Sequence, residues 1–499
     1  MRIALVQPIT ERSASLGIQK QPTGIMSLAA QLIRAGFEVE MIHTQKTEIV
    51  KRLQESNPDY VGISTMTPNL PDGMEIAQAA KDFNRKMITI LGGWHAWGCV
   101  QEGGEVLEEI LNENSPIDFV VAGEGEITLT QLLQNPSDEN IPGVSTFRDG
   151  AIKTNPFKRI ENLDELEDPS YEGLDVNTYR DLRNGALDLS IHAKRACRFS
   201  CKYCLTASAY GRGVRKFSPS RTVRNIEKIV QEFYPQVITF TDEDFFADIK
   251  WVEELVSLLE KSDCKMSFDT FAGVPDLIAL KRKGKGDLLD RMAKVGFSSF
   301  TIGVESFNEK TLSAYGKEPM ILATMTPEER KQPYDLVAQH QKSVQEAINF
   351  AHEHGILCVG DYMVGNMNET EEEVREGFEK FKALKNLFLA YIPVFTPYPG
   401  TPLWKEACES GRLKITPKGG IDWSSFDAGS GAMEMGYDAK GLRDELELEF
   451  YTSPRYIKDM IGMLRKNPKA WRMFKSRYKY LAKAWYSRHF PITSGTESV

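Results

Sequence analysis

Short apolar runs separated by helix-period segments recur along most of the chain, and this alternation restricts its fold more than any other feature. Within residues 1–150 the expected strands are Ile3–Val6, Glu38–Ile42, Tyr60–Ser64, Ile88–Leu91 and Phe119–Val121. Strands that alternate with helices pair in parallel and are covered by helices on both faces. The first 150 residues therefore predict an α/β domain with a doubly wound, Rossmann-like sheet.

The alternation stops at a linker, residues 151–185, which is rich in Asp, Glu, Pro and Asn, and it resumes over residues 186–404. The strands expected there are Leu189–Ile191, Val237–Phe240, Met266–Phe268, Ser299–Val304, Leu357–Met363 and Leu389–Phe395. Six strand–helix units predict a curved parallel sheet, a partial (β/α)6 TIM-like barrel. Residues 405–499 are expected to form a C-terminal helical region.

Three cysteines lie within eight residues, directly after the first strand of this second series. The stretch reads Cys197-Arg198-Phe199-Ser200-Cys201-Lys202-Tyr203-Cys204. Thiolates hold iron–sulfur clusters, and three of them leave one iron free to bind a small molecule. The spacing predicts a 4Fe–4S cluster on Cys197, Cys201 and Cys204, with chemistry at the open iron.

Other uses of the three thiols fit less well but stay open at this stage. A structural zinc site needs four protein ligands, and the nearest further candidate is His192. Structural thiols are usually buried singly. A disulfide framework needs a denser and even set, whereas this chain has 7 cysteines and begins with a strand rather than a secretory leader. We therefore expect a reducing, cytoplasmic environment.

Glycine and small polar residues follow several strands of the first domain, at the edge where parallel sheets bind ligands. They are Ser64 after the third expected strand, Gly92 and Gly93 after the fourth, and Gly123 and Glu124 after the fifth. Positions without bulky side chains let a large planar or nucleotide-bearing ligand approach the backbone. A single glycine of this kind is more often an ordinary turn, but their recurrence predicts a ligand site.

The overall charge argues against one broad class of partner. With 61 Lys and Arg against 70 Asp and Glu, the formal net charge is −9. Nucleic-acid-binding proteins need a broad basic field, so we expect no nucleic acid partner. The sequence has no uninterrupted run of about 18 apolar residues, so we expect no membrane-spanning helix.

A segment near the C-terminus, residues 469–488, combines basic and aromatic residues. Its apolar side chains recur every three or four positions and would line one face of a helix: Trp471, Phe474, Tyr478, Leu481 and Trp485. Such a helix docks on a protein core, or it lies against a membrane surface or a hydrophobic substrate. Peripheral membrane contact is thus one of two open expectations for this segment.

Together with four later motifs, the cysteine spacing makes the chain resemble the cobalamin-dependent radical S-adenosylmethionine (SAM) enzymes, from Met1 to about Met460. CxxxCxxC with an aromatic residue, here Tyr203, before the last cysteine is the radical SAM motif. The resemblance implies that the cluster binds SAM at its open iron and that Tyr203 belongs to the cofactor site.

Two of the later motifs imply further SAM contacts. Phe240-Thr241-Asp242-Glu243-Asp244-Phe245 is similar to the family's FxDDxF stretch, which implies that Asp242 and Glu243 lie near the SAM ammonium group. Gly303-Val304-Glu305-Ser306 is similar to GxES, which implies that Gly303, Glu305 and Ser306 lie near the ribose.

The remaining two motifs follow the last strands. Gly365-Asn366-Met367-Asn368-Glu369-Thr370 resembles GxPGET, and Gly365 would contact a cofactor, although Met367 and Asn368 replace the proline and the second glycine. Pro397-Tyr398-Pro399-Gly400-Thr401-Pro402-Leu403 resembles the family's PYPGTPL. Residues 318–340 are longer than the usual passage between two elements, and they either shape the substrate pocket or form a surface insert.

The first domain resembles the cobalamin-binding domain of these enzymes, which implies that Ser64, Gly92, Gly93, Gly123 and Glu124 contact cobalamin. The DxHxxG motif that supplies an axial histidine in other cobalamin enzymes is absent. The resemblance thus implies cobalamin without a protein histidine on cobalt. We do not assign His95 as a ligand, because a lone histidine is more often hydrogen-bonded within the structure.

The resemblance also implies a reaction. Reductive cleavage of SAM gives a 5′-deoxyadenosyl radical, which removes hydrogen from an unactivated substrate carbon, and methylcobalamin then donates a methyl group. Oxidative cyclisation, as in the anaerobic magnesium-protoporphyrin ester cyclase, is the alternative, and a non-catalytic cobalamin or redox sensor is a third possibility from another class. The expected partners are a small-molecule or hydrophobic substrate and an electron donor such as flavodoxin or ferredoxin.

Overall fold

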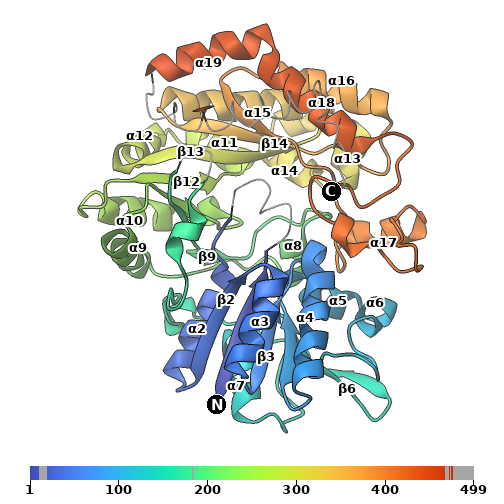
Figure 1. Cartoon of the computed structure of the whole chain (residues 1–499). Coiled ribbons are helices and arrows are strands. Elements are labelled where there is room, and N and C mark those ends of the chain that lie inside the picture. Colours follow the sequence, from blue (N-terminus) through green and yellow to red (C-terminus); the bar gives the residue numbers. More distant parts are fainter. Residues whose placement is uncertain (10–18, 182–184, 467–470, 472–473, 476–499) are drawn as a thin grey trace, which may run out of the picture.

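Two parallel-stranded units are stacked on one another in the computed structural model, which describes residues 1–9, 19–181, 185–466, 471 and 474–475. Figure 1 shows the N-terminal sheet in blue below and the second sheet in green and yellow above it. The carboxyl-end loops of both units meet in the middle of the molecule, and the C-terminal helices α18 and α19 lie at the far side of the upper unit.

The N-terminal unit contains a seven-stranded sheet in the order β2-β1-β3-β4-β5-β6-β7. All pairs from β2 to β5 are parallel, and β6 and β7 add an antiparallel hairpin at one edge. This confirms the predicted doubly wound sheet, while the hairpin escaped prediction. The strands are β1 (Arg2–Pro8), β2 (Glu38–Thr44), β3 (Tyr60–Ser64), β4 (Ile88–Gly92), β5 (Phe119–Val121), β6 (Val144–Arg148) and β7 (Ala151–Thr154).

Helices cover both faces of this sheet. On one face α2 (Thr23–Arg34) and α7 (Gly125–Gln134) pack over Ile3 and Leu5 of β1. On the other face Ala4 and Val6 meet the remaining helices. These are α3 (Lys46–Ser56), α4 (Leu70–Phe83), α5 (Trp94–Glu102) and the short α6 (Gly104–Glu108), with the 3-10 turn η1 (Thr67–Asn69) leading into α4. Alternate residues of β1 thus face opposite cores, as expected for a buried strand.

The second unit is a six-stranded, wholly parallel sheet in the order β15-β14-β13-β12-β11-β8. The strands follow one another in sequence order, and in the described part of the chain the two edge strands do not pair with each other, which is the arrangement of a partial barrel. The predicted partial TIM-like barrel is therefore confirmed. The strands are β8 (Asp188–Ile191), β11 (Val237–Phe240), β12 (Ser267–Phe271), β13 (Phe297–Glu305), β14 (Leu357–Tyr362) and β15 (Leu387–Tyr391). The last strand ends before the predicted Phe395, because Pro393 has no N–H to donate to the ladder.

The helices outside the barrel are α9 (Pro219–Phe233), α10 (Ile249–Leu259), α11 (Val274–Arg282), α12 (Gly286–Val295), α13 (Glu309–Ala314), α14 (Glu318–Ala323), α15 (Leu336–Glu353) and α16 (Glu371–Lys382), with 3-10 turns η4 (Phe245–Ala247) and η5 (Glu329–Lys331). Most of these helices share one large core with the strands, whereas α13 and α14 form a small separate cluster through Leu312, Ile321 and Leu336. Local sequence fixes several ends: Thr370 and Glu373 form a capping box that starts α16.

In the segment between the two units, residues 155–181 are held in place by buried side chains. Ile160, Leu163 and Leu166 are buried in a small cluster of their own. Two 3-10 turns, η2 (Leu163–Glu165) and η3 (Val176–Tyr179), punctuate it.

The C-terminal region contacts both units. After α17 (Pro402–Glu409), residues 410–438 are irregular apart from η6 (Trp423–Ser425), and there Trp423 and Phe426 join the core of the N-terminal unit. Helices α18 (Ala439–Thr452) and α19 (Pro454–Lys466) then pack on the barrel. Of the predicted aromatic stripe, Trp471 is 47 % exposed and Phe474 packs against the barrel core, whereas Tyr478, Leu481 and Trp485 lie outside the described residues.

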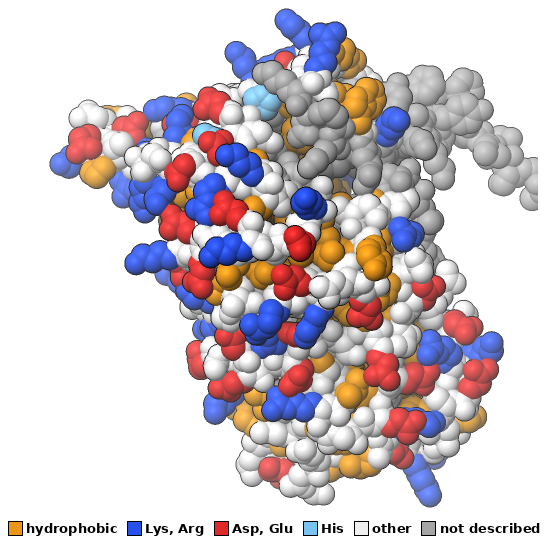
Figure 2. All heavy atoms as spheres, turned by 90° about the vertical axis from the view of Figure 1, so that its left-hand side faces the viewer, with side chains coloured by type: hydrophobic (Ala, Val, Ile, Leu, Met, Phe, Trp, Pro, Cys, Tyr) orange, Lys and Arg blue, Asp and Glu red, His pale blue; other side chains and the backbone are white. Residues whose placement is uncertain are grey.

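Charges of both signs interleave on the face shown in Figure 2, so this face presents no broad field of one sign. Among the helices that the structure describes, none has the length and apolar character needed to cross a bilayer.

Candidate cofactor sites at the junction of the two units

The three predicted cluster ligands lie on one loop. Strands β9 (Lys194–Arg195) and β10 (Arg215–Lys216) form a two-stranded antiparallel ribbon, and the loop between them carries Cys197, Cys201 and Cys204. Helix α8 (Leu205–Tyr210) begins directly after Cys204. All three thiols are free and half-buried.

The donor set fits an iron–sulfur cluster better than a single metal ion. Burial raises the pKa of Cys197 to about 12, and the charges of Asp244, Cys204 and Cys201 add to this, so the three sulfurs lie near one another. Among the described residues, however, no three His, Cys, Asp or Glu side chains converge as ligands of one ion. A cluster takes each thiolate on a different iron, whereas zinc needs its ligands to converge.

An ion-pair network braces the start of the cysteine loop. Arg198 donates to both carboxylate oxygens of Asp244, at 2.7 and 2.8 Å, and to Asp276 on α11 at 2.7 Å. The Cys197 sulfur lies 3.9 Å from Asp244. Bidentate Arg–carboxylate pairs fix orientation as well as distance. This network therefore holds the loop against the barrel.

The three acids of the second-strand motif point to three different places. Asp242 accepts hydrogen bonds from the backbone N–H groups of Ala193 and Lys194, at 2.6 and 2.8 Å, and burial raises its pKa to about 6. Glu243 lines a cavity between the two units, and Asp244 holds Arg198. Asp242 thus fixes the backbone that leads into the cysteine loop, and its second oxygen, Oδ2, has no partner.

A buried ion pair lies beside the cysteine loop at the end of β13. Glu305 accepts from the hydroxyl of Tyr203 at 2.8 Å and from Lys317 at 2.9 Å. Burial disfavours the ammonium group, but Glu305 and Cys201 outweigh it, so the pKa of Lys317 is raised. Glu305 has a φ of 68°, and β13 has a register shift between Gly303 and Glu305. A Cβ on residue 303 would clash with Oε1 of Glu305, so a larger residue there would displace the carboxylate from its place between Tyr203 and Lys317.

Two predicted residues take structural positions. The Ser306 hydroxyl donates to Glu369 at 3.3 Å. Gly365 has a φ of 83°, and a Cβ there would lie 3.2 Å from Ala439 and from Val394. Gly365 therefore packs between α18 and the segment that follows β15, and its role in cofactor contact stays a prediction.

The long passage at residues 318–340 begins on the cysteine loop. The Met320 sulfur of α14 lies 3.8 Å from that of Cys201, and Tyr315 accepts from the N–H of Lys202 at 3.0 Å. The next turn, η5, has no buried residue. The start of the passage thus covers the candidate cluster site, its middle around η5 is surface, and its far end is buried again at Leu336 and His340.

A cavity of about 280 Å³ lies between the two units. All five residues predicted to contact cobalamin line it: Ser64, Gly92, Gly93, Gly123 and Glu124. Residues 23–28 of α2 and residues 190–192 of β8 and the turn after it complete opposite walls. The strand order reverses between β1 and β3, and open parallel sheets bind ligands at such switch points.

The cavity lining includes Gly92, Gly93 and Gly123, which we call the glycine wall, and steric crowding explains why glycine is needed at residue 93. Gly93 has a φ of 91°, and a Cβ there would lie 2.5 Å from the carbonyl oxygen of Thr65. A larger residue would push β3 and β4 apart at the cavity edge.

His95 and His192 take different positions relative to the cavity. His95 is buried outside the cavity lining, where its nitrogens meet Thr67 at 3.3 Å and Cys99 at 3.1 Å, and burial lowers its pKa to about 3. This supports the structural interpretation. His192 lines the cavity instead, and burial followed by the charge of Arg195 lowers its pKa to about 4.

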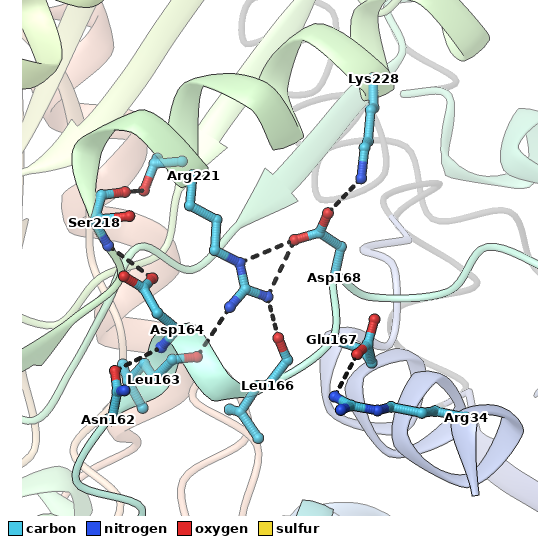
Figure 3. A network of polar contacts seen from close by, with 11 residues as sticks. Arg34, Asn162, Leu163, Asp164, Leu166, Glu167, Asp168, Ser218, Arg221 and Lys228 are labelled. Atoms are coloured by element: carbon cyan, nitrogen blue, oxygen red, sulfur yellow. Dashed lines mark hydrogen bonds and ion pairs between the residues drawn. The ribbon is translucent and has the colours of Figure 1, made fainter.

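The linker lies along one side of the cavity, and Figure 3 shows the polar contacts that hold it there. Arg221 of α9 donates to the carbonyl oxygens of Leu163 and Leu166 and to Asp168, which also pairs with Lys228 at 2.6 Å. Residues 166–169 line the cavity. Glu167 pairs with Arg34 of α2 at 2.6 Å, so the linker is tied to both units.

Sequence reasoning missed several residues of these sites. Asp244, Arg198 and Lys317 form the ion pairs around the cysteine loop, and Arg195 and His192 line the cavity. Charged residues next to a ligand motif were the available signal for Arg195 and Arg198. No local signal pointed to Lys317, because its partner Glu305 lies twelve residues earlier, at the end of a strand.

The comparisons with known proteins agree with this division. Residues 13–133 match the B12 binding domain, and residues 192–381 match the radical SAM superfamily. An uncharacterized methyltransferase of Pyrococcus horikoshii is 26 % identical over 477 residues, covering 92 % of this chain and 95 % of the relative. The anaerobic magnesium-protoporphyrin IX monomethyl ester cyclase of Cereibacter sphaeroides is 25 % identical, covering 81 % of this chain and 63 % of the relative.

Solved structures share the fold. The cobalamin-dependent SAM radical enzyme OxsB, with aqua-cobalamin and SAM bound, matches with a TM-score of 0.67 and 17 % identity, covering 98 % of this chain and 75 % of that one. The radical SAM methyltransferase TsrM from Kitasatospora setae matches with a TM-score of 0.63 and 18 % identity, covering 83 % and 79 %. The chain belongs to the radical SAM superfamily, as a member that carries a B12-binding domain ahead of its radical SAM domain.

Proposed function

We propose that this protein methylates an unactivated carbon of a small-molecule or lipid-like substrate, with a 4Fe–4S cluster, SAM and cobalamin. One observation carries the proposal: Arg195 lines the cavity proposed for cobalamin and stands two residues before Cys197. A radical source and a methyl donor must reach the same substrate carbon, and adjacency of the two sites provides that orientation.

The chain's residues divide the task of holding these groups. Cys197, Cys201 and Cys204 would hold the cluster, with Lys317 and Glu305 as a buried ion pair beside them. Ser64, Gly92, Gly93 and Gly123 would let the corrin ring approach the strand ends. When bound, SAM at the reduced cluster supplies a 5′-deoxyadenosyl radical, and methylcobalamin supplies the methyl group.

The alternative is a ring-forming reaction, because relatives named as cyclases match nearly as much of the chain as the methyltransferases do. SAM labelled in its methyl group separates the two. Anaerobic incubation of the reduced protein with a cell extract and labelled SAM should yield a labelled product. Consumption of substrate without label in the product would favour cyclisation instead.

Two partners complete the proposal. A one-electron donor such as flavodoxin or ferredoxin would reduce the cluster. The basic aromatic segment from residue 469 onward would bring the protein to a membrane surface or to a hydrophobic substrate, which the half-exposed Trp471 supports.

A further inference from the structure

The cysteine loop is connected at both ends to a very short two-stranded ribbon. Strands β9 and β10 are two residues each, and Arg195 lies opposite Arg215 in their register. Residues 196–214, with all three cysteines, lie between them. A two-stranded ribbon alone is marginally stable, so the position of this loop depends on the Arg198 network that ties it to the barrel and on what else the ribbon is attached to.

A further attachment lies on the other domain. Arg195 pairs with Glu124 at 2.9 Å and with Glu126 at 2.5 Å, and Arg215 pairs with Glu124 at 2.5 Å. We call these four residues the clamp. The side chain of Glu124 is fully buried and that of Arg215 is 6 % exposed, and Glu124 also accepts from the N–H of Ile160 at 2.8 Å. Moving the ribbon away from Glu124 would leave buried charges without partners, so the two move together.

A second connection holds the other end of the loop. Tyr210 ends α8, the helix that begins after Cys204, and its ring packs against Trp94 and Trp97 of α5 at 5.5 and 5.9 Å between centroids. Trp94 and Tyr210 line the interdomain cavity, as do Glu124, Glu126 and Arg195. Both ends of the cysteine loop are therefore attached to the wall of that cavity.

We propose that the clamp and Tyr210 couple the occupant of the interdomain cavity to the iron–sulfur loop, so that cobalamin binding sets the position of the three cysteines. The proposal rests on the proposed function, because it takes cobalamin as the occupant. A ligand in the cavity meets residues 123–126 and Trp94, which carry the two connections. Glu124, Arg195, Arg215 and Tyr210 are then positioning residues, which act through the cysteines they hold.

Such coupling is reciprocal: if cobalamin changes the cluster site, the cluster changes cobalamin affinity by the same factor. The test measures the dissociation constant of hydroxocobalamin by absorbance titration on the full-length chain, with and without a reconstituted cluster. We expect the cluster to tighten binding about fivefold or more in the wild-type protein, the low end of measured couplings. The variant Glu124→Gln should bind cobalamin with no such difference.

A matched control and a second variant keep the test sharp. Lys216→Ala alters the next residue of the same strand, whose partner Asp248 is in the same domain, and should retain the full coupling. Tyr210→Leu removes the second connection and leaves every charge of the clamp in place, although it also removes the ring that lies 5.8 Å from the Arg215 guanidinium, and it serves if Glu124→Gln does not fold. The EPR signal of the reduced cluster should also change on adding cobalamin in the wild type and in Lys216→Ala, but not in Glu124→Gln.

Equal dissociation constants with and without cluster in the wild type would overturn the inference, as would full coupling in both Glu124→Gln and Tyr210→Leu. These results leave cluster assembly and cobalamin binding intact. Failure of the proposed function looks different: the wild-type chain would then bind no cobalamin, assemble no cluster, or hold both and form no 5′-deoxyadenosine or methylated product.

Discussion

The two walls of the interdomain cavity are built from different kinds of residue. The N-terminal wall is made largely of strand ends with glycine and serine, and its two acids, Glu124 and Glu126, are paired with arginines. The barrel wall presents functional groups such as His192 and Glu243, which form no ion pair with other described residues. Bare backbone admits a bulky ligand closely, and side chains act on it. The comparison indicates that one domain shapes the site and the other supplies its chemistry.

Two acids sharpen the contrast. Glu124 comes from the N-terminal wall, and although burial opposes its charge, Arg215 and Arg195 lower its pKa overall. Glu243 comes from the barrel wall, burial raises its pKa to about 7, and its Oε2 atom has no hydrogen-bond partner. Glu124 joins the domains, whereas Glu243 is available to a ligand.

The largest expected effect concerns the barrel side. Cys201→Ala removes one of three cluster ligands, so cluster assembly and 5′-deoxyadenosine formation should both be lost, as measured by iron content and chromatography. Cys408→Ala is the matched control, because Cys408 is exposed and remote from the loop in sequence. An active cluster in Cys201→Ala would contradict the assignment.

On the N-terminal wall, Gly93→Ala should weaken cobalamin binding by about tenfold or more, because the added methyl group meets the Thr65 backbone. Gly150→Ala also places a side chain at a positive φ, 76°, but with open space around it in the β6–β7 turn. Absorbance titration of both variants separates strain from cavity shape. Equal affinities would argue against the glycine wall.

A smaller effect is expected at Glu243. Its folded-state pKa of about 7 lies above the ordinary 4.5, so its contribution to stability is complete below pH 4.5 and is lost as the pH rises through 7. The Glu243→Gln variant has no titrating group at this position. Its free energy of unfolding should therefore rise relative to that of the wild type by about 1–2 kcal/mol between pH 5.5 and 8. Thermal unfolding of the cofactor-free proteins at both pH values measures this. Parallel pH dependence would show that Glu243 is charged in the folded state.

The smallest effect is expected from the tail. Truncation after Pro468 should weaken liposome binding or the use of a hydrophobic substrate while leaving cluster and cobalamin content unchanged. Vesicle co-sedimentation of the full-length and truncated chains is the measurement. Unchanged behaviour in both assays would assign Trp471 and Phe474 to ordinary packing.

Periodicity predicted every parallel strand, because burial on both faces leaves continuous apolar runs such as Ile3–Val6. It missed the β6–β7 hairpin, whose β7 has no buried residue. Motif spacing located the cysteines and the cavity wall. It did not assign partners: Asp242, Glu243 and Asp244 are adjacent in sequence, yet one binds backbone, one lines the cavity and one holds Arg198. Such roles depend on tertiary contacts that no local pattern encodes.

The most direct test of the account is to reconstitute the full-length protein with iron, sulfide and cobalamin without oxygen, reduce it, add SAM, and measure 5′-deoxyadenosine. The account predicts its formation in the wild type and none in Cys201→Ala. A wild-type protein that holds both cofactors and forms no 5′-deoxyadenosine would contradict the proposed radical mechanism and favour a sensor.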